Sequence, residues 1–330
     1  YITRDKKEYW AMFYSAAGGG VLIALMALFK TYLGSIIDDK VWKGLAEGLN
    51  YGFGFMVIFM LHFTVATKQP AMTAARFAEA VEKNPQGKTL NMKLAQLLVD
   101  VFRSQSVAVL GNVVVAMGLA ALIAFVYQHQ TGEPLMNSEN IAYQLHRIDP
   151  LDGSLWFAAI AGVWLFCSGI ISGYFDNRSN YLNMRMRLAQ HPLLKKLMSE
   201  KSRVKFANYM HENYGSLIGN FCFGMLLGLT GLVGYLTHLP LDIRHVAFSS
   251  ANLGYSAVSG QFAYPFFLQC IAFVLLIGLV NLMVSFSLTL WVALRSLNTE
   301  IDSWWAIWHE VCQIVRKRPL SLFFPVQLDK

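Results

Sequence analysis

One short segment gathers most of the side chains on which chemistry could depend. Asp242, Arg244 and His245 fall within four residues of one another, in a stretch that is otherwise poor in charge. A carboxylate can accept a proton, a guanidinium can bind an anion, and an imidazole can exchange a proton near neutral pH. The hydroxyl and amide side chains that could complete a polar site follow at Ser249, Ser250 and Asn252.

Two interpretations of this segment stay open. In the first, it is a re-entrant segment that presents a polar site, because its small residues let backbones approach closely. Non-helical backbone is tolerated at membrane depth only where protein buries it or where it lines a wet cavity. In the second, it is an ordered external loop held by an ion pair between Asp242 and Arg244, and it binds nothing.

Two secondary candidates lie at or within long apolar stretches. Asp176, Asn177 and Arg178 end one such stretch, where charged side chains usually lie at the membrane interface. His62 lies within another, where a histidine either relays protons or forms a hydrogen bond with a neighbouring helix.

Six long uncharged stretches must position these residues. Each reaches or approaches the roughly 20 apolar residues that a helix needs to cross a bilayer. Lipid cannot satisfy backbone polar groups, so we expect each stretch to be a helix. The chain is 55% hydrophobic and only 14% charged, with a mean hydropathy of +0.41. These features predict an all-α, polytopic membrane protein with spans at Tyr9–Phe29, Leu49–Thr67, Val107–Tyr127, Ser154–Phe175, Leu217–Leu236 and Phe262–Leu294.

The basic residues indicate an orientation. Of the 27 Lys and Arg residues, 22 lie near the two ends of the chain or in the second and fourth loops. The third and fifth loops contain one each, Arg147 and Arg244. By the positive-inside rule, both termini are predicted to be cytoplasmic. Insertion bias and contact with anionic lipid then explain the net charge of +7, and nucleic acid is not an expected partner.

The spans are predicted to form a single transmembrane domain over residues 1–330, made of three hairpins. The pattern [LI]-G-N-x-x-x-[AG]-M begins at Leu110 and again at Ile218, which suggests parallel repeats over 1–105, 106–213 and 214–330. Amphipathic cytoplasmic helices are expected near Leu90–Val101 and Ile301–Val315. The tryptophans of the second suit either the lipid headgroup region or packing against other helices.

The sequence contains none of the common signatures of soluble enzymes. It has no phosphate loop, HExxH, GxSxG or dinucleotide fingerprint. Its four cysteines are far apart, and we expect no disulfide framework, metal site or redox role from them. No cofactor is therefore expected, while catalysis on a membrane substrate stays undecided.

Three stretches carry a family resemblance: Leu239–Gly254, Tyr51–Phe55 and Lys68–Met72. In these stretches the chain resembles the bacterial site-specific recombinase transmembrane proteins, a gonococcal-recombinase-like family. The resemblance implies a Gram-negative inner-membrane protein with a long region before Tyr1. An opening of Tyr-Ile-Thr-Arg-Asp, without a cleavable-signal pattern, agrees with that implication. The resemblance implies no particular catalytic residues.

Strand exchange, which the family's name suggests, finds little support in the residues. A tyrosine recombinase groups Arg and His around one phosphate and typically has a His-x-x-Arg element, yet none of the eight histidines has Arg three residues later. A serine recombinase needs a soluble catalytic domain, and no segment of that size lies between the spans. We expect a non-catalytic or transport-type domain that handles a lipid or envelope component or anchors an assembly. Its expected partners are membrane lipids and either another protein or a second copy. A membrane enzyme acting on such a component is the second hypothesis, and DNA recombination is the third.

Overall fold

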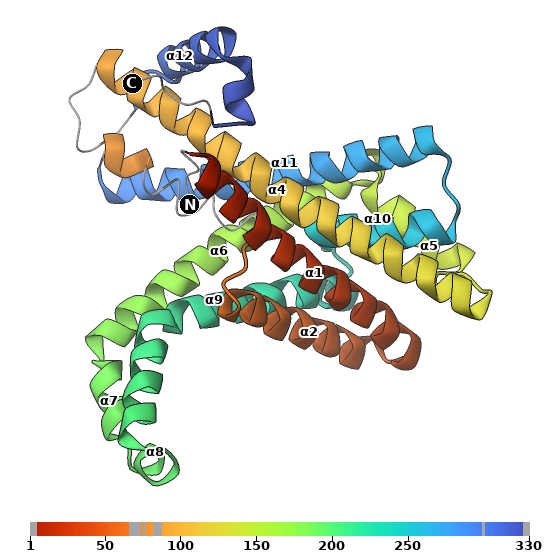
Figure 1. Ribbon diagram of the computed structural model, residues 1–330, viewed down its shortest axis with the longest axis horizontal. Helices are drawn as coiled ribbons and strands as arrows, with labels where there is room; N and C mark the ends of the chain where they lie inside the picture. Colours follow the sequence, from red (N-terminus) through yellow and green to blue (C-terminus); the bar gives the residue numbers. More distant parts are fainter. Residues whose placement is uncertain (1–4, 66–73, 75–76, 82–87, 299–300, 326–330) are drawn as a thin grey trace.

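The computed structural model describes residues 5–65, 74, 77–81, 88–298 and 301–325, and this part of the chain contains helices and no strands (Figure 1). The long helices are α1 (Lys6–Ile36), α2 (Lys40–Met60), α4 (Lys88–Thr131), α6 (Ser154–Tyr181), α9 (Glu200–Thr237) and α11 (Tyr264–Ser296). The short helices are α5 (Ser138–Ile148), α7 (Met184–Gln190), α8 (Pro192–Leu197), α10 (Val246–Ser259) and α12 (Trp304–Lys317). Two 3-10 turns, η2 (Pro150–Asp152) and η3 (Pro319–Leu322), complete the described elements.

Five of the described helices are long and apolar enough to cross a membrane: α1, α4 from Leu90 onward, α6, α9 and α11. The fold is thus all-α with several candidate spans, as predicted. Helix α2 is not among them, because it starts with Lys40 and Lys43 and also contains Glu47. It ends at Met60, and the chain turns at His62, whose φ is +59°. The second predicted span therefore starts too late and extends too far.

The predicted loops separate into two groups in space. The turn between α1 and α2, helix α5 and the turn between α10 and α11 lie toward the right of Figure 1. Helices α7, α8 and α12 lie toward the left. Segments that the sequence assigns to the same side of a membrane therefore share one end of the molecule.

Glycines explain how closely α2 and α9 pack. Gly48 and Gly52 of α2 face α9, and a Cβ atom added at Gly224 of α9 would collide with the backbone of Tyr51. A Cβ added at Gly228 would likewise collide with Gly48. Glycines four residues apart on each helix let the two backbones touch, as is common between membrane helices.

The two copies of the repeated motif make different contacts. Asn112 of α4 donates from Nδ2 to the carbonyl oxygens of Ala16 (2.5 Å) and Thr64 (3.0 Å), which ties α4 to α1 and to the chain after α2. Asn220 of α9 donates to Ser216, one turn earlier in its own helix. The three-repeat organisation stays a prediction.

The chain between α9 and α11 enters the bundle and leaves it at the same end. Asn281, midway along α11, accepts from the backbone N–H of Val246 (3.1 Å) and donates to the carbonyl of Arg244 (2.9 Å). Helix α10 then runs back to the start of α11, and 10 of its 14 residues are buried. The re-entrant interpretation stays a prediction.

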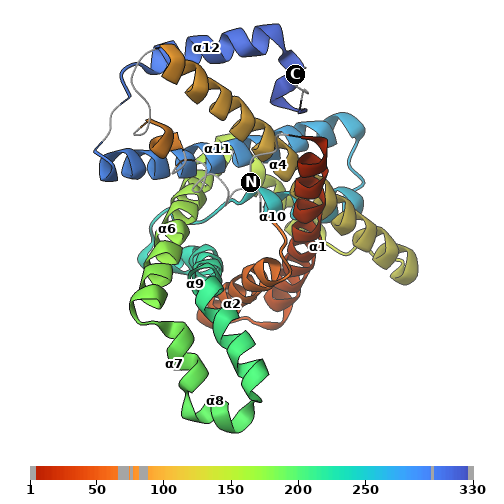
Figure 2. The same cartoon turned by 60° about the vertical axis from the view of Figure 1, so that its left-hand side comes forward.

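Helix α9 bends where it leaves the bundle, and helices α7 and α8 continue as an arm (Figure 2). Two backbone groups that pair in an unbroken helix, the carbonyl of His211 and the N–H of Gly215, have partners on α6. The hydroxyl of Ser179 donates to the first (3.3 Å), and Asp176 accepts from the second (3.0 Å). Side chains that intervene in the helical ladder are a recognised cause of such bends.

The second predicted amphipathic helix corresponds to α12. Its Ile307 and Val311 are buried in a cluster with the first turns of α4, so one side of the helix packs against protein. Trp304, Trp305 and Trp308 are 51%, 78% and 59% exposed. Packing therefore accounts for one side of α12. Trp304 stacks on Phe77 at the edge of this cluster (6.2 Å), and Trp305 and Trp308 remain largely exposed.

Candidate binding site

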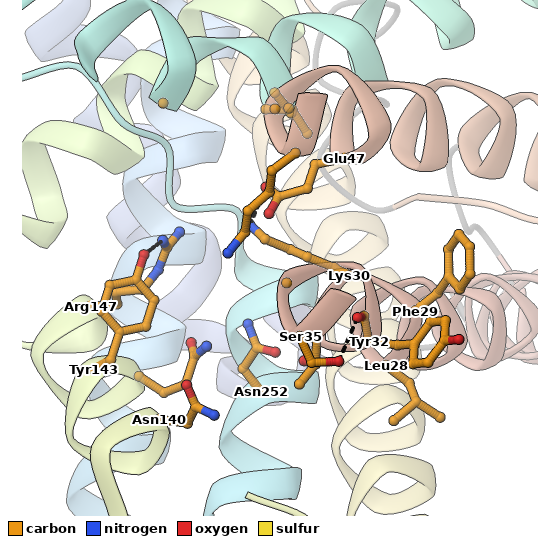
Figure 3. A pocket seen from close by; sticks show the side chains of 18 of the residues that line it. Leu28, Phe29, Lys30, Tyr32, Ser35, Glu47, Asn140, Tyr143, Arg147 and Asn252 are labelled. Carbon is orange, nitrogen blue, oxygen red and sulfur yellow. Dashed lines mark hydrogen bonds and ion pairs between the residues drawn. The ribbon is translucent and has the colours of Figure 1, made fainter. Parts of the chain in front are cut away.

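A cavity of about 1080 Å³ lies between the end of α1, the start of α2, helix α5 and the end of α9. Helix α10 contributes Asn252, the end of α4 contributes Ile123 and Tyr127, and the chain after α9 contributes residues 241–243. Figure 3 shows Lys30, Glu47, Tyr143 and Arg147 at this cavity. Side chains from three separate stretches of the chain, 25–47, 123–147 and 227–252, thus meet at the end of the molecule that contains α5.

The cavity contains more positive than negative charge. Its lining includes two acidic residues, Glu47 and Asp242, and four basic ones, Lys30, Lys40, Lys43 and Arg147. Lys30 and Glu47 form an ion pair (3.1 Å) that joins α1 to α2. The formal excess of two positive charges favours an anion.

The remaining walls are largely apolar. Aliphatic and aromatic side chains from α1, α4 and α9 surround the charged groups, and they include Leu25, Leu28, Phe29, Ile123, Leu227 and Leu232. A cavity with a few convergent polar groups among apolar walls is typical of ligand sites. This combination suits a ligand with an anionic group and an apolar portion.

Arg147 of α5 is the best-positioned cation. It donates to the hydroxyl of Tyr143 (2.7 Å) and to the carbonyl of Ile243 (3.2 Å), and it lies 3.4 Å from the carboxylate of Asp242. Burial disfavours its charge, but Asp242 and Tyr143 more than offset this and raise the pKa of Arg147. In turn, the positive charge of Arg147 lowers the pKa of the Tyr143 phenol.

Arg244 makes contacts that stabilise the fold. Its Nε donates to the carbonyl of Arg147 (2.7 Å), and its Nη1 donates to Asp242 (2.6 Å) and to the carbonyl of Ile243 (2.8 Å). Its guanidinium lies over the ring of Phe157 (4.8 Å), and only 7% of its side chain is exposed. The expected Asp242–Arg244 ion pair is therefore present, and Arg244 does not line the cavity.

Asp242 lies between the two arginines at the cavity wall. Burial alone would raise its pKa, but Arg147, Arg244 and the hydrogen bonds to its carboxylate together lower the pKa to about 2. The carboxylate is therefore ionised at any physiological pH.

The remaining candidate residues of the 242–252 segment lie in different places. Asn252 lines the cavity. His245 is buried among the rings of Phe55 (6.2 Å), Phe223 (5.8 Å) and Phe248 (5.9 Å). The buried hydroxyl of Ser250 donates within α10, to the carbonyl of Ala247 (2.8 Å), and Ser249 is also buried away from the cavity.

None of the secondary candidates lines this cavity. Asp176 braces the bend in α9, and the neighbouring Asn177 and Arg178 are exposed. The structure places His62 after α2 and not within a span, where it is exposed and its carbonyl accepts from Ser15. The helix predicted to extend over His62 therefore ends before it, at Met60.

Sequence reasoning missed the main cations of the cavity. Lys30 directly follows the predicted first span, and Arg147 was noticed only as the one basic residue of the third loop. The signal that could have found Arg147 is Tyr143 four residues before it, since these positions share a helix face. Lys30 left no such signal, because its partner Glu47 belongs to another helix.

Within the residues that the structure describes, no group of three or more His, Cys, Asp or Glu side chains is placed to hold a metal ion.

The fold and the cavity define a class: an all-α polytopic membrane protein with a partly cationic, partly apolar pocket near one end. The family model described as "Site-specific recombinase" matches residues 1–325, and the chain belongs to that family. No curated protein and no solved structure matches the chain.

Proposed function

We propose that this chain is a transport-type or ligand-holding membrane domain whose cavity binds an anionic amphiphile, either a lipid or another component of the cell envelope. The observation that carries the proposal is the cavity itself, where Lys30 and Arg147 lie among apolar side chains. The cations would contact a phosphate or carboxylate, and the walls formed by α1, α4 and α9 would contact the apolar portion.

The proposed location is the bacterial inner membrane, with both termini of this segment in the cytoplasm. Six spans in three hairpins are proposed, with the shorter and more polar α2 as the sixth beside the five apolar helices. Three features support it: five apolar helices, the uneven distribution of basic residues, and the grouping of the predicted loops at two ends of the molecule. In this orientation the cavity faces away from the cytoplasm. Its ligand would then come from the outer leaflet or from the space beyond it.

The ion pairs in the cavity suit reversible binding. Arg147 shares Asp242 with Arg244, and Lys30 pairs with Glu47 and lies over the ring of Tyr51 (5.5 Å). Each cation thus stays charged and oriented without a ligand, and an incoming anion adds a further partner to groups that are already in place. Preorganised groups of this kind reduce the cost of binding.

Native mass spectrometry of the protein extracted with its surrounding lipid tests this proposal. We expect a co-purifying anionic amphiphile in the wild type and at least a tenfold loss of it in Lys30→Gln/Arg147→Gln. Arg316→Gln/Lys317→Gln is the matched control, since it removes two exposed charges of α12 that lie outside the cavity. Equal retention by all three proteins would refute the proposal.

The pair formed by Tyr143 and Arg147 favours a second candidate, an enzyme acting on the bound lipid or envelope precursor. Arg147 lowers the pKa of Tyr143, so the phenol gives up its proton more readily than an ordinary tyrosine and is a better general acid. Tyr143→Phe would then abolish turnover while the amphiphile is still retained. If turnover is found and Tyr143→Phe leaves it unchanged, this assignment of Tyr143 is wrong.

DNA recombination, which the family's description names, is the third candidate. The cavity favours amphiphile binding over this activity, because its apolar walls have no counterpart on DNA. Tight, sequence-selective binding of duplex DNA by the solubilised protein, measured by fluorescence anisotropy, would restore the recombinase interpretation.

A further inference from the structure

The arm, defined as residues 177–205, carries a charge equal to that of the whole chain. It contains eight basic residues and one acidic residue, Glu200, so its formal net charge is +7. The whole chain also has a net charge of +7, and the other residues therefore sum to zero. The arm therefore accounts for the whole net positive charge of the chain.

The tip of the arm also exposes large apolar side chains. Leu193 and Leu197 of α8 are 61% and 78% exposed, and Tyr181 at the end of α6 is 89% exposed. Leu193 and Leu197 are four residues apart, so they lie on one face of the helix. Lys195 and Lys196, between them, are exposed as well. Basic residues beside exposed apolar ones are typical of helices that lie in a membrane interface.

The arm is held out from the helix bundle. Helices α7 and α8 pack against each other and against the adjoining parts of α6 and α9. Helix α9 bends, and the arm points away from the remaining helices (Figure 2). Its charged and apolar side chains are therefore presented outward.

We propose that the arm docks on an anionic phospholipid surface. Leu193 and Leu197 insert at the level of the head groups, and the surrounding Lys and Arg side chains contact lipid phosphates. Duplex DNA would satisfy the basic residues but not the leucines, because protein–DNA interfaces are polar and strongly charged. Because the tip exposes apolar and basic side chains together, it matches an anionic lipid surface better than it matches DNA.

A fluorescent probe at the tip tests the docking. The variant Leu193→Cys, in a background with the four native cysteines replaced, is labelled with a polarity-sensitive dye and placed in nanodiscs. With phosphatidylglycerol in the membrane, we expect blue-shifted emission that is quenched by lipid-borne quenchers and reversed by high salt. In pure phosphatidylcholine the dye should stay in water. The same dye at Asn137→Cys, an exposed position at the other end, should report no difference.

Charge reversal separates docking from folding. Lys195→Glu/Lys196→Glu changes two exposed side chains, so the melting temperature should stay that of the parent, while the response to phosphatidylglycerol is lost. A tip dye that stays in water in every membrane overturns the proposal, as does an equal response in neutral lipid. A response to duplex DNA with none to lipid overturns it in favour of nucleic acid.

Discussion

Arg147 and Arg244 share the carboxylate of Asp242, but they face different surroundings. Arg244 is enclosed by backbone carbonyls and by the ring of Phe157, whereas Arg147 lines the cavity. Sequence reasoning left Arg244 open between ligand binding and an ion pair with Asp242. In the structure Arg244 makes the ion pair, and Arg147 on α5 faces the cavity.

This division predicts different outcomes for two matched substitutions. Arg244→Gln leaves Asp242 with the more distant arginine only and should cost about 3 kcal/mol of unfolding free energy. Arg147→Gln retains the 2.6 Å pair and should cost about 1 kcal/mol, but it should release the bound amphiphile. Thermal unfolding in detergent, combined with lipid analysis, distinguishes the two.

The double variant Asp242→Asn/Arg244→Gln provides the control for this prediction. It removes both charges, so it should recover much of the stability that Arg244→Gln loses. If the double variant is no more stable than Arg244→Gln alone, the contribution of Arg244 to stability does not come from its ion pair with Asp242.

Asp242 should also impose a pH dependence on stability. Its pKa is about 2 in the folded protein and 3.8 ordinarily, so its contribution is full above about pH 4 and is lost as the pH falls through 2. The stability advantage of the wild type over Asp242→Asn should be constant from pH 7 to about pH 5. It should then shrink by about 2 kcal/mol between about pH 4 and pH 2. An advantage that is already lost at pH 5 would contradict this assignment.

At the scale of elements, the contact between α2 and α9 depends on backbone proximity. Gly224→Ala would place a methyl group against the backbone of Tyr51, which cannot rotate away, and should destabilise the protein by about 3 kcal/mol. Gly118→Ala is the matched control, since a Cβ there meets nothing within 4 Å, and it should be neutral or slightly stabilising. Equal melting temperatures for the two variants would show that α2 and α9 pack less closely.

Asn281 holds the segment between α9 and α10 by two hydrogen bonds, to Arg244 and Val246, and makes a third to Ala158 of α6. Asn281→Leu has a similar volume but satisfies none of these backbone groups. We expect faster amide hydrogen exchange in residues 241–250 and unchanged exchange in α12, measured by mass spectrometry. A uniform increase over the whole chain would instead indicate global destabilisation.

At the scale of the whole molecule, the predicted orientation can be tested by labelling. Single cysteines at Lys196 and Lys317 should resist an impermeant thiol reagent in intact spheroplasts, whereas one at Asn137 should react. All three positions are exposed, so packing does not protect them. Ser256, which also belongs to the loop expected outside, is buried and should stay unlabelled. Reaction at Lys196 from outside would contradict the six-span orientation.

The sequence predicted the helical class, because five spans are long, apolar and nearly free of charge. It misjudged α2, since the polar start of that helix makes its hydropathy ambiguous and the turn at His62 has no proline or glycine to mark it. It located Asp242 and Asn252 because polar residues stand out in an apolar chain. It missed Lys30 because the cavity forms only where α1, α2 and α5 pack together. No local sequence pattern predicts that packing.

Helix α4 runs for 44 residues, about 66 Å at the usual helical rise, which is twice the thickness of a bilayer's hydrocarbon core. Its first turns are buried against α12, and its last turns line the cavity through Ile123 and Tyr127. An uninterrupted helix of this kind behaves as a stiff rod, which does not shift at one end alone. A movement of the wall at Ile123 and Tyr127 therefore has to tilt or slide that rod, and so displaces the turns of α4 that pack against α12.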